Sequence, residues 1–117
     1  DEETARVMAA SPLPSLIGAL TPTEVMNALR AGADAVKLFP ASLGGVAYMK
    51  ALRGPLPDVP FVPTGGIGPA EVSAFLEAGA AAIGAGGELC PSSAIAAGDF
   101  GLITERARAF VTAIPAG

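Results

Sequence analysis

The chain has 117 residues, the size of a single domain, with 11 acidic residues, 7 Lys and Arg, and no His. The net charge of −4 argues against nucleic-acid binding, which needs clustered basic residues. The lack of His excludes His-based zinc sites and Ser-His-Asp or Cys-His nucleophile systems. The single Cys90 forms no internal disulfide, and no apolar run approaches the ~18 residues of a membrane span. We therefore expect a cytoplasmic protein without metal or cofactor, and with neither a nucleic-acid nor a membrane partner.

Helical segments and short apolar runs alternate along the chain. Proline or acidic residues in first turns and glycine after last turns are typical of helix ends. These signals predict helices over residues 2–10, 22–32, 45–52, 69–79, 92–97 and 100–113. Apolar runs of four or five residues are typical of buried parallel strands. They predict strands over residues 16–20, 35–39, 59–62 and 81–85.

One segment is repeated within the chain. Residues 20–33 and 67–80 share a proline, a Glu-Val pair and an Ala-Gly-Ala, with Pro22 matching Pro69 and Glu24 matching Glu71. Such a repeat indicates that one supersecondary unit is used more than once. Each copy lies between two apolar runs, so each predicts a strand, a helix and a second strand, the parallel βαβ unit.

The fold class predicted is α/β, with four βα units. An open doubly wound sheet is less favoured, because residues 84–87 lack the third glycine of the dinucleotide-binding fingerprint. A complete (β/α)₈ barrel needs at least about 200 residues, so residues 1–117 fit its C-terminal half. Apolar residues make up 51% of the chain and charged residues 15%. For a small domain this predicts apolar surface covered by more chain or by a partner.

Lys37 is the first candidate for chemistry, because it lies inside the apolar run Ala35-Val36-Lys37-Leu38-Phe39. Burial favours a neutral amine, which attacks carbonyl carbons to form a Schiff base. Near the carboxyl end of a barrel strand, such a lysine faces the active site. The alternative is a lysine with a buried stem and a solvent-exposed head. From the pattern alone both remain open, whereas Lys50 fits an exposed helix surface.

Two glycine-rich loops follow the last two predicted strands. Thr64-Gly65-Gly66 follows one run, and Gly84-Ala85-Gly86-Gly87 follows the other. Glycines at strand ends let backbone N–H groups approach an anion, and phosphate sites of barrels often use such loops. Each loop alone also fits an ordinary turn, while both on adjacent strands favour anion binding. The Thr64 hydroxyl could bind substrate or bond to the backbone.

The motifs together resemble those of a known family. Val36-Lys37-Leu38-Phe39-Pro40-Ala41, Gly44-Gly45-Val46, Arg53-Gly54-Pro55 and Pro63-Thr64-Gly65-Gly66-Ile67 are similar to the C-terminal half of 2-keto-3-deoxy-6-phosphogluconate (KDPG) / 4-hydroxy-2-oxoglutarate (KHG) aldolases. The resemblance covers nearly all of the chain. It implies a (β/α)₈ barrel, a homotrimer, and a lyase of Entner–Doudoroff carbohydrate metabolism that releases pyruvate by class I aldol cleavage.

The resemblance also implies roles for individual residues. Lys37 would be the Schiff-base lysine, Phe39 would flank the pocket, and Thr64 would contact the 2-keto acid substrate. Gly65 and Gly66, with Gly86 and Gly87 of the second loop, would bind phosphate. The chain departs from the family where Gly87 and Glu88 replace a usual serine and aromatic residue, which weakens the predicted phosphate site.

The family's general-base glutamate and its substrate-binding arginine belong to an N-terminal half that these residues do not contain. The acids near the predicted strand ends, Glu24, Asp34, Glu71 and Glu88, offer no convincing base, and we read Glu24 and Glu71 as first-turn acids and Asp34 as a turn residue. We therefore expect the chain alone to be inactive or very slow, and a missing N-terminal half-barrel or equivalent chain to complete it. Two alternatives are a non-catalytic phosphate-binding half-barrel and a barrel like phosphosugar isomerases or thiamin-phosphate synthase. Neither explains a lysine inside a strand.

Overall fold

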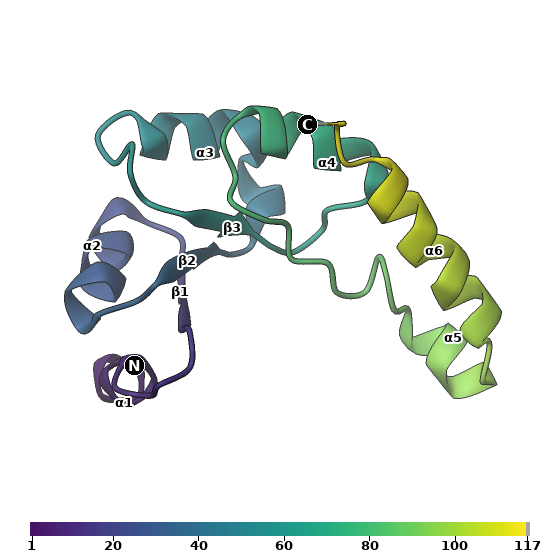
Figure 1. Cartoon of the computed structure of the whole chain (residues 1–117), viewed down its shortest axis with the longest axis horizontal. Helices are drawn as coiled ribbons and strands as arrows, with labels where there is room; N and C mark the ends of the chain where they lie inside the picture. Colours follow the sequence, from purple (N-terminus) through teal and green to yellow (C-terminus); the bar gives the residue numbers. More distant parts are fainter. Residues whose placement is uncertain (117) are drawn as a thin grey trace.

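A computed structural model describes residues 1–116 of the chain as an α/β fold, shown in Figure 1. In chain order the elements are α1 (Glu2–Ala9), β1 (Leu16–Ala19), α2 (Pro22–Ala31), β2 (Ala35–Leu38), the short 3₁₀ helix η1 (Ala41–Leu43), α3 (Gly45–Arg53), β3 (Phe61–Pro63), α4 (Pro69–Glu77), α5 (Ser92–Ala97) and α6 (Phe100–Thr112). The six helices predicted from the sequence are confirmed, with ends that differ by no more than two residues.

The three strands form one parallel sheet in the order β1-β2-β3, so strands consecutive in the chain are neighbours in space. The register places Lys37 of β2 between Gly18 of β1 and Val62 of β3. A helix links each strand to the next, as parallel neighbours require.

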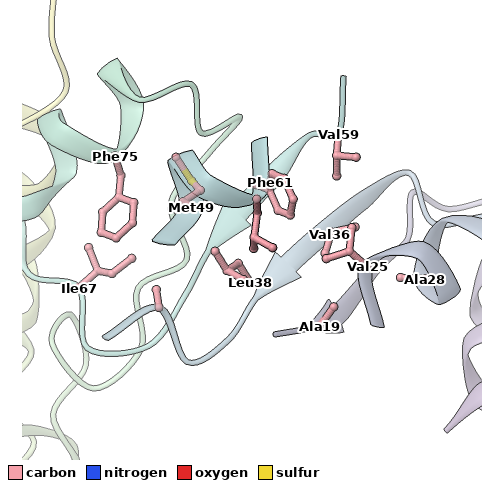
Figure 2. Close-up of a cluster of buried hydrophobic side chains, with 12 residues drawn as sticks. Ala19, Val25, Ala28, Val36, Leu38, Met49, Val59, Phe61, Ile67 and Phe75 are labelled. Carbon is pink, nitrogen blue, oxygen red and sulfur yellow. The ribbon is translucent and has the colours of Figure 1, made fainter. Parts of the chain in front are cut away.

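The hydrophobic core lies between this sheet and its helices. Successive side chains of a strand point to opposite faces. In β2, Val36 and Leu38 are buried in the core, whereas Lys37 is only half-buried. Figure 2 shows the core running from Ala28 and Val25 of α2, past Val36, Leu38 and Phe61, to Met49 of α3 and Phe75 of α4. Lys37 therefore belongs to the face of the sheet that the core leaves free.

The repeated segment forms equivalent helix starts, as its sequence predicts. At α2, the Thr21 side chain accepts from the Glu24 N–H, while the Glu24 carboxylate accepts from the Thr21 N–H, a reciprocal capping box. At α4, the Glu71 carboxylate accepts from the Gly68 N–H at 2.9 Å. Each helix begins with a proline whose missing N–H needs no partner there.

The predicted fourth strand, residues 81–85, does not form, and the expectation of four complete βα units is wrong for the described residues. The segment runs beside β3 and donates from Ala81 to Phe61 and from Gly84 to Pro63, but its pairing is an isolated bridge between Thr64 and Gly84. Alanine and glycine have low strand propensity and few side-chain atoms to pack. Within residues 1–116, no further strand pairs with the outer side of this segment. Its two backbone hydrogen bonds to β3 are therefore not enough to form a strand.

The molecule is extended, and its last two helices lie to one side of the sheet (Figure 1). Its radius of gyration is 15.2 Å, against about 13.5 Å for a compact domain of this length. Its accessible surface is 6800 Å², against about 5800 Å² expected for its mass. The larger accessible surface agrees with the prediction that this chain leaves apolar surface for more chain or a partner to cover. Within residues 1–116, no helix is long and apolar enough to cross a membrane.

Candidate active site

Lys37 lies near the carboxyl end of β2, on the face of the sheet opposite the core. Its Nζ is 4.8 Å from the centroid of the Phe39 ring, within the range of a cation–π contact. Phe39, two residues further along, is 49% exposed and covers the amine from one side. Lys37 as a whole is half-buried, and it lines a surface cavity that a small molecule can approach.

An open cavity of about 230 Å³ lies beside this amine. Its lining consists of Gly18, Ala19, Leu20, Glu24, Lys37 and Phe39, from β1, the start of α2 and β2. Gly18 is next to Lys37 in the sheet, and a Cβ built on it would meet no atom within 4 Å. The free space in front of the amine is therefore large enough for a small carbonyl compound.

Glu24 lines the same cavity, but its carboxylate caps a helix. Its Oε2 accepts from the N–H of Thr21 at 2.8 Å, from the N–H of Leu20 at 2.9 Å, and from the Thr21 hydroxyl at 3.0 Å. The two backbone bonds, first that of Thr21 and then that of Leu20, hold the pKa of Glu24 below its ordinary value. A carboxylate held ionised in this way is a weak proton acceptor at neutral pH. This confirms Glu24 as a first-turn acid.

The two glycine-rich loops lie side by side at the same edge, joined by the bridge between Thr64 and Gly84. Gly65 and Gly66 have φ of +97° and +71°, a conformation that favours glycine. A Cβ on Gly65 would lie 2.8 Å from Phe39 Cε2, so this loop packs against the ring that covers Lys37. The structure therefore brings Lys37, Phe39, Thr64 and Gly65 together.

Gly86 and Gly87 lie further out. Both are exposed, and a Cβ on either would meet nothing within 4 Å. Within residues 1–116, the amides of Gly66 and Gly87 donate to no protein acceptor. Anion binding by these N–H groups stays a prediction, and among the described residues no hydrogen bond joins the outer loop to Lys37.

The Thr64 hydroxyl donates to the Val62 carbonyl at 3.1 Å. The sequence left open whether this hydroxyl binds substrate or bonds to the backbone, and in the structure it bonds to the backbone. The hydroxyl also packs against Gly84, where any Cβ would overlap the Thr64 side chain. A substrate contact by Thr64 needs its remaining hydrogen-bonding capacity.

Two further residues support the site: Gly84, which the sequence places in the second glycine loop without a role of its own, and Tyr48, which the sequence analysis missed. Gly84 lets the second loop lie against Thr64. Tyr48 of α3 donates its hydroxyl to the Leu20 carbonyl at 2.8 Å and so holds the loop that lines the Lys37 cavity. Tyr48 is the single tyrosine of the chain, and no local pattern indicates a partner so distant in sequence. No group of three or more Cys, Asp or Glu residues able to hold a metal occurs within residues 1–116.

An α/β fold with a lysine beside a carbonyl-sized cavity and two adjoining glycine loops defines a candidate Schiff-base enzyme. The family model of KDPG and KHG aldolases matches residues 1–106. The 2-dehydro-3-deoxy-phosphogluconate aldolase of Pseudoalteromonas atlantica is 40% identical over 87 residues, which are 74% of this chain and 40% of that protein. The chain belongs to the KDPG and KHG aldolase family, whose members are lyases.

Solved structures agree with this assignment. A structure described as native KDPGal superposes with a TM-score of 0.88 at 32% identity, covering 97% of this chain and 53% of that one. The KDPG aldolase of Legionella pneumophila, with pyruvate captured as a covalent carbinolamine, superposes with a TM-score of 0.77 at 30% identity, covering 95% and 53%. The chain therefore spans about half the length of these relatives.

Proposed function

We propose that the chain carries the Schiff-base half of a class I aldolase, which cleaves a 2-keto-4-hydroxy acid, such as 2-keto-3-deoxy-6-phosphogluconate, to pyruvate and an aldehyde. The observation that carries the proposal is the position of Lys37, on the free face of the sheet beside a cavity of about 230 Å³. The covalent carbinolamine of pyruvate in the related Legionella enzyme supports amine chemistry in this family.

The chemistry begins when the Lys37 amine attacks the C2 carbonyl of the substrate. The carbinolamine loses water to give an iminium ion, which withdraws electrons from C3. A base removes the C4 hydroxyl proton, the C3–C4 bond breaks, and the aldehyde leaves. The remaining enamine is protonated at C3, and hydrolysis of the iminium releases pyruvate and restores the lysine. Phe39 covers one side of the amine and limits the direction from which the carbonyl approaches.

Residues 1–116 supply the lysine and the glycine loops but no suitable base. Glu24 is held ionised by its helix cap. We propose that the chain is the C-terminal half of a (β/α)₈ barrel and that a complementary half supplies the base. The sequential parallel strands, with the lysine on the face away from the core, support this arrangement. A cytoplasmic homotrimer in carbohydrate metabolism belongs to the same proposal and is supported by the family membership.

The test is to trap pyruvate on the protein with borohydride and to locate the adduct by peptide mass spectrometry, both for the chain alone and with the complementary half present. We expect one adduct, on Lys37. Lys37→Arg should abolish it, and Lys50→Arg, at an exposed position on α3, should not. An adduct on Lys50, or none when the complementary half is present, would contradict the aldolase proposal and favour a non-catalytic half-barrel.

A further inference from the structure

The Phe39 ring packs beside both the Lys37 amine and the loop at Gly65. The Lys37 Nζ lies over the face of the ring, 4.8 Å from its centroid. One edge of the ring faces Gly65, because a Cβ built there would lie 2.8 Å from Phe39 Cε2 and 3.0 Å from Phe39 Cδ2. A methyl group at Gly65 would therefore push the ring, and the ring keeps its place beside the amine because Gly65 has no side chain.

The backbone that carries Phe39 is held on both sides. Phe39 follows directly on β2, and residues two apart in a strand share a face, so its side chain stays beside that of Lys37. The Phe39 N–H donates to the Ala19 carbonyl of β1 at 3.1 Å, and the Ser42 N–H donates to the Gly65 carbonyl at 3.2 Å. With the backbone fixed in this way, the half-exposed ring can leave the amine only by rotating its side chain.

The space open to the amine lies toward β1. The cavity of about 230 Å³ that Lys37 and Phe39 line extends over Gly18, which pairs with Lys37 in the sheet. A Cβ built on Gly18 would meet no atom within 4 Å. The ring thus covers the amine from one side, while the side toward Gly18 stays open to a carbonyl compound. Attack on a carbonyl carbon is fast only when the amine is held in the correct direction.

We propose that Phe39 is a positioning residue, which directs the Lys37 amine into the cavity beside Gly18, and that Gly65 fixes the place of its ring. The inference rests on the proposed aldolase function and concerns its first step, the attack of the amine on the carbonyl carbon. It gives Gly65 a role in that step in addition to the anion binding predicted for its loop, and it leaves the substrate class unchanged.

The first test measures the rate of pyruvate trapping on Lys37 over a range of pyruvate concentrations. It uses the form of the protein that traps pyruvate, either the chain alone or its complex with the complementary half. Phe39→Ala removes the ring and should lower the limiting rate about tenfold, the order expected from a misdirected reacting group. The pyruvate concentration that gives half this rate should change less than about twofold, because the cavity stays open. Phe39→Tyr keeps the ring and should retain most of the rate.

Phe100→Ala is the matched control. Phe100 lies at the start of α6, is 67% exposed and does not line the Lys37 cavity. Its substitution removes the same ring atoms from the surface and should leave the limiting rate of trapping unchanged.

The second test asks whether Gly65 acts through the ring. Gly65→Ala should lower the limiting rate of trapping in the wild-type background, because its Cβ displaces the Phe39 ring. In the Phe39→Ala background the same substitution should change this rate less than about twofold, since the ring is already absent. The φ of +97° makes alanine unfavourable at Gly65 in both backgrounds. The loss of stability, measured by urea unfolding, should therefore be similar in both, which separates backbone strain from displacement of the ring.

Three results would overturn the positioning role while Lys37 still traps pyruvate. They are an unchanged limiting rate in Phe39→Ala, equal losses in Phe39→Ala and Phe39→Tyr, and equal effects of Gly65→Ala on trapping in both backgrounds. A change confined to the half-saturating pyruvate concentration would overturn it too, because the ring would then only help to bind pyruvate. Absence of any Lys37 adduct in the wild-type protein, alone and with the complementary half, would instead overturn the aldolase function on which the proposal rests.

Discussion

At the scale of single residues, the acids near the strand ends stabilise the backbone. The Glu24 carboxylate caps α2. The Asp34 carboxylate accepts from the Ser15 N–H at 2.7 Å and from its hydroxyl at 3.1 Å, which ties the start of β1 to the start of β2. Helix-start and turn signals identify both acids as structural. Sequence does not reveal that Asp34 has its partner in Ser15, because that pairing depends on strand register.

The bond between Ser15 and Asp34 predicts a stability that depends on pH. The Ser15 N–H, and then its hydroxyl, lower the pKa of Asp34 in the folded protein. As pH falls, the unfolded chain therefore takes up the Asp34 proton before the folded protein does. The contribution of Asp34 to the free energy of unfolding is complete above the ordinary carboxyl pKa of about 3.9. It is lost as pH falls through the lower pKa of Asp34 in the folded protein. Ser15→Ala should destabilise the protein at pH 7 and do so less near pH 3. Urea unfolding at both values measures this, and an equal loss at both would contradict it.

Gly84 predicts a steric effect on the site. A Cβ there would overlap the Thr64 side chain and lie 2.8 Å from its Cγ2. Gly84→Ala should displace the Thr64 loop, cost about 1–3 kcal/mol of unfolding free energy, and slow pyruvate trapping on Lys37.

Gly86→Ala is the matched control for that substitution, because its Cβ meets nothing within 4 Å. It should leave stability and trapping unchanged. Denaturant unfolding and timed borohydride trapping measure both variants, and similar behaviour of the two would show that the contact with Thr64 is unimportant.

At the scale of elements, helices follow from local signals, and strands depend on their neighbours. The proline and glutamate pairs at the starts of α2 and α4 act through their own turns, so the sequence indicates both helices. Residues 81–85 carry the apolar run of a strand, yet they form only the bridge at Gly84. These residues have β3 on one side only, and their Ala and Gly residues contribute too little packing to extend the bridge into a strand.

The position of α3 against the site gives a further prediction. The Tyr48 hydroxyl bonds to the Leu20 carbonyl, and Leu20 lines the Lys37 cavity. Tyr48→Phe keeps the ring and removes the bond, which should cost about 0.5–1.5 kcal/mol and slow pyruvate trapping by loosening the loop. Lys50→Met, at an exposed position of the same helix, serves as the control. Unchanged trapping in Tyr48→Phe would show that the cavity does not depend on this bond.

At the scale of the whole molecule, apolar residues remain on the surface. A cavity of about 680 Å³ lies between α4, residues 81–85 and α6, and its lining is mostly apolar side chains, among them Phe110, Val111 and Ile114. Val111 is 68% and Ile114 54% exposed. The composition predicts such a surface, but the helix over residues 100–113 alone does not show which of its faces remains uncovered, because that depends on how far α6 lies from the sheet.

This surface predicts association of the chain studied alone. The exposed apolar side chains around the cavity of about 680 Å³ favour burial against another surface. The outer edge of β1 is also unpaired in the sheet, so it can pair with another chain. Sedimentation of the chain over a range of concentrations should show oligomers or aggregates. Replacing Val111 and Ile114 by Lys should reduce association, whereas Val7→Lys, on α1 at the other end of the molecule, should reduce it much less.

If a complementary half covers the surface, adding that half should replace the oligomers by a defined complex. A cooperative, folded monomer at all concentrations would show that the half-barrel proposal is wrong. A chain that needs a second half leaves the apolar surface around α6 exposed when it is alone, and such a surface should associate.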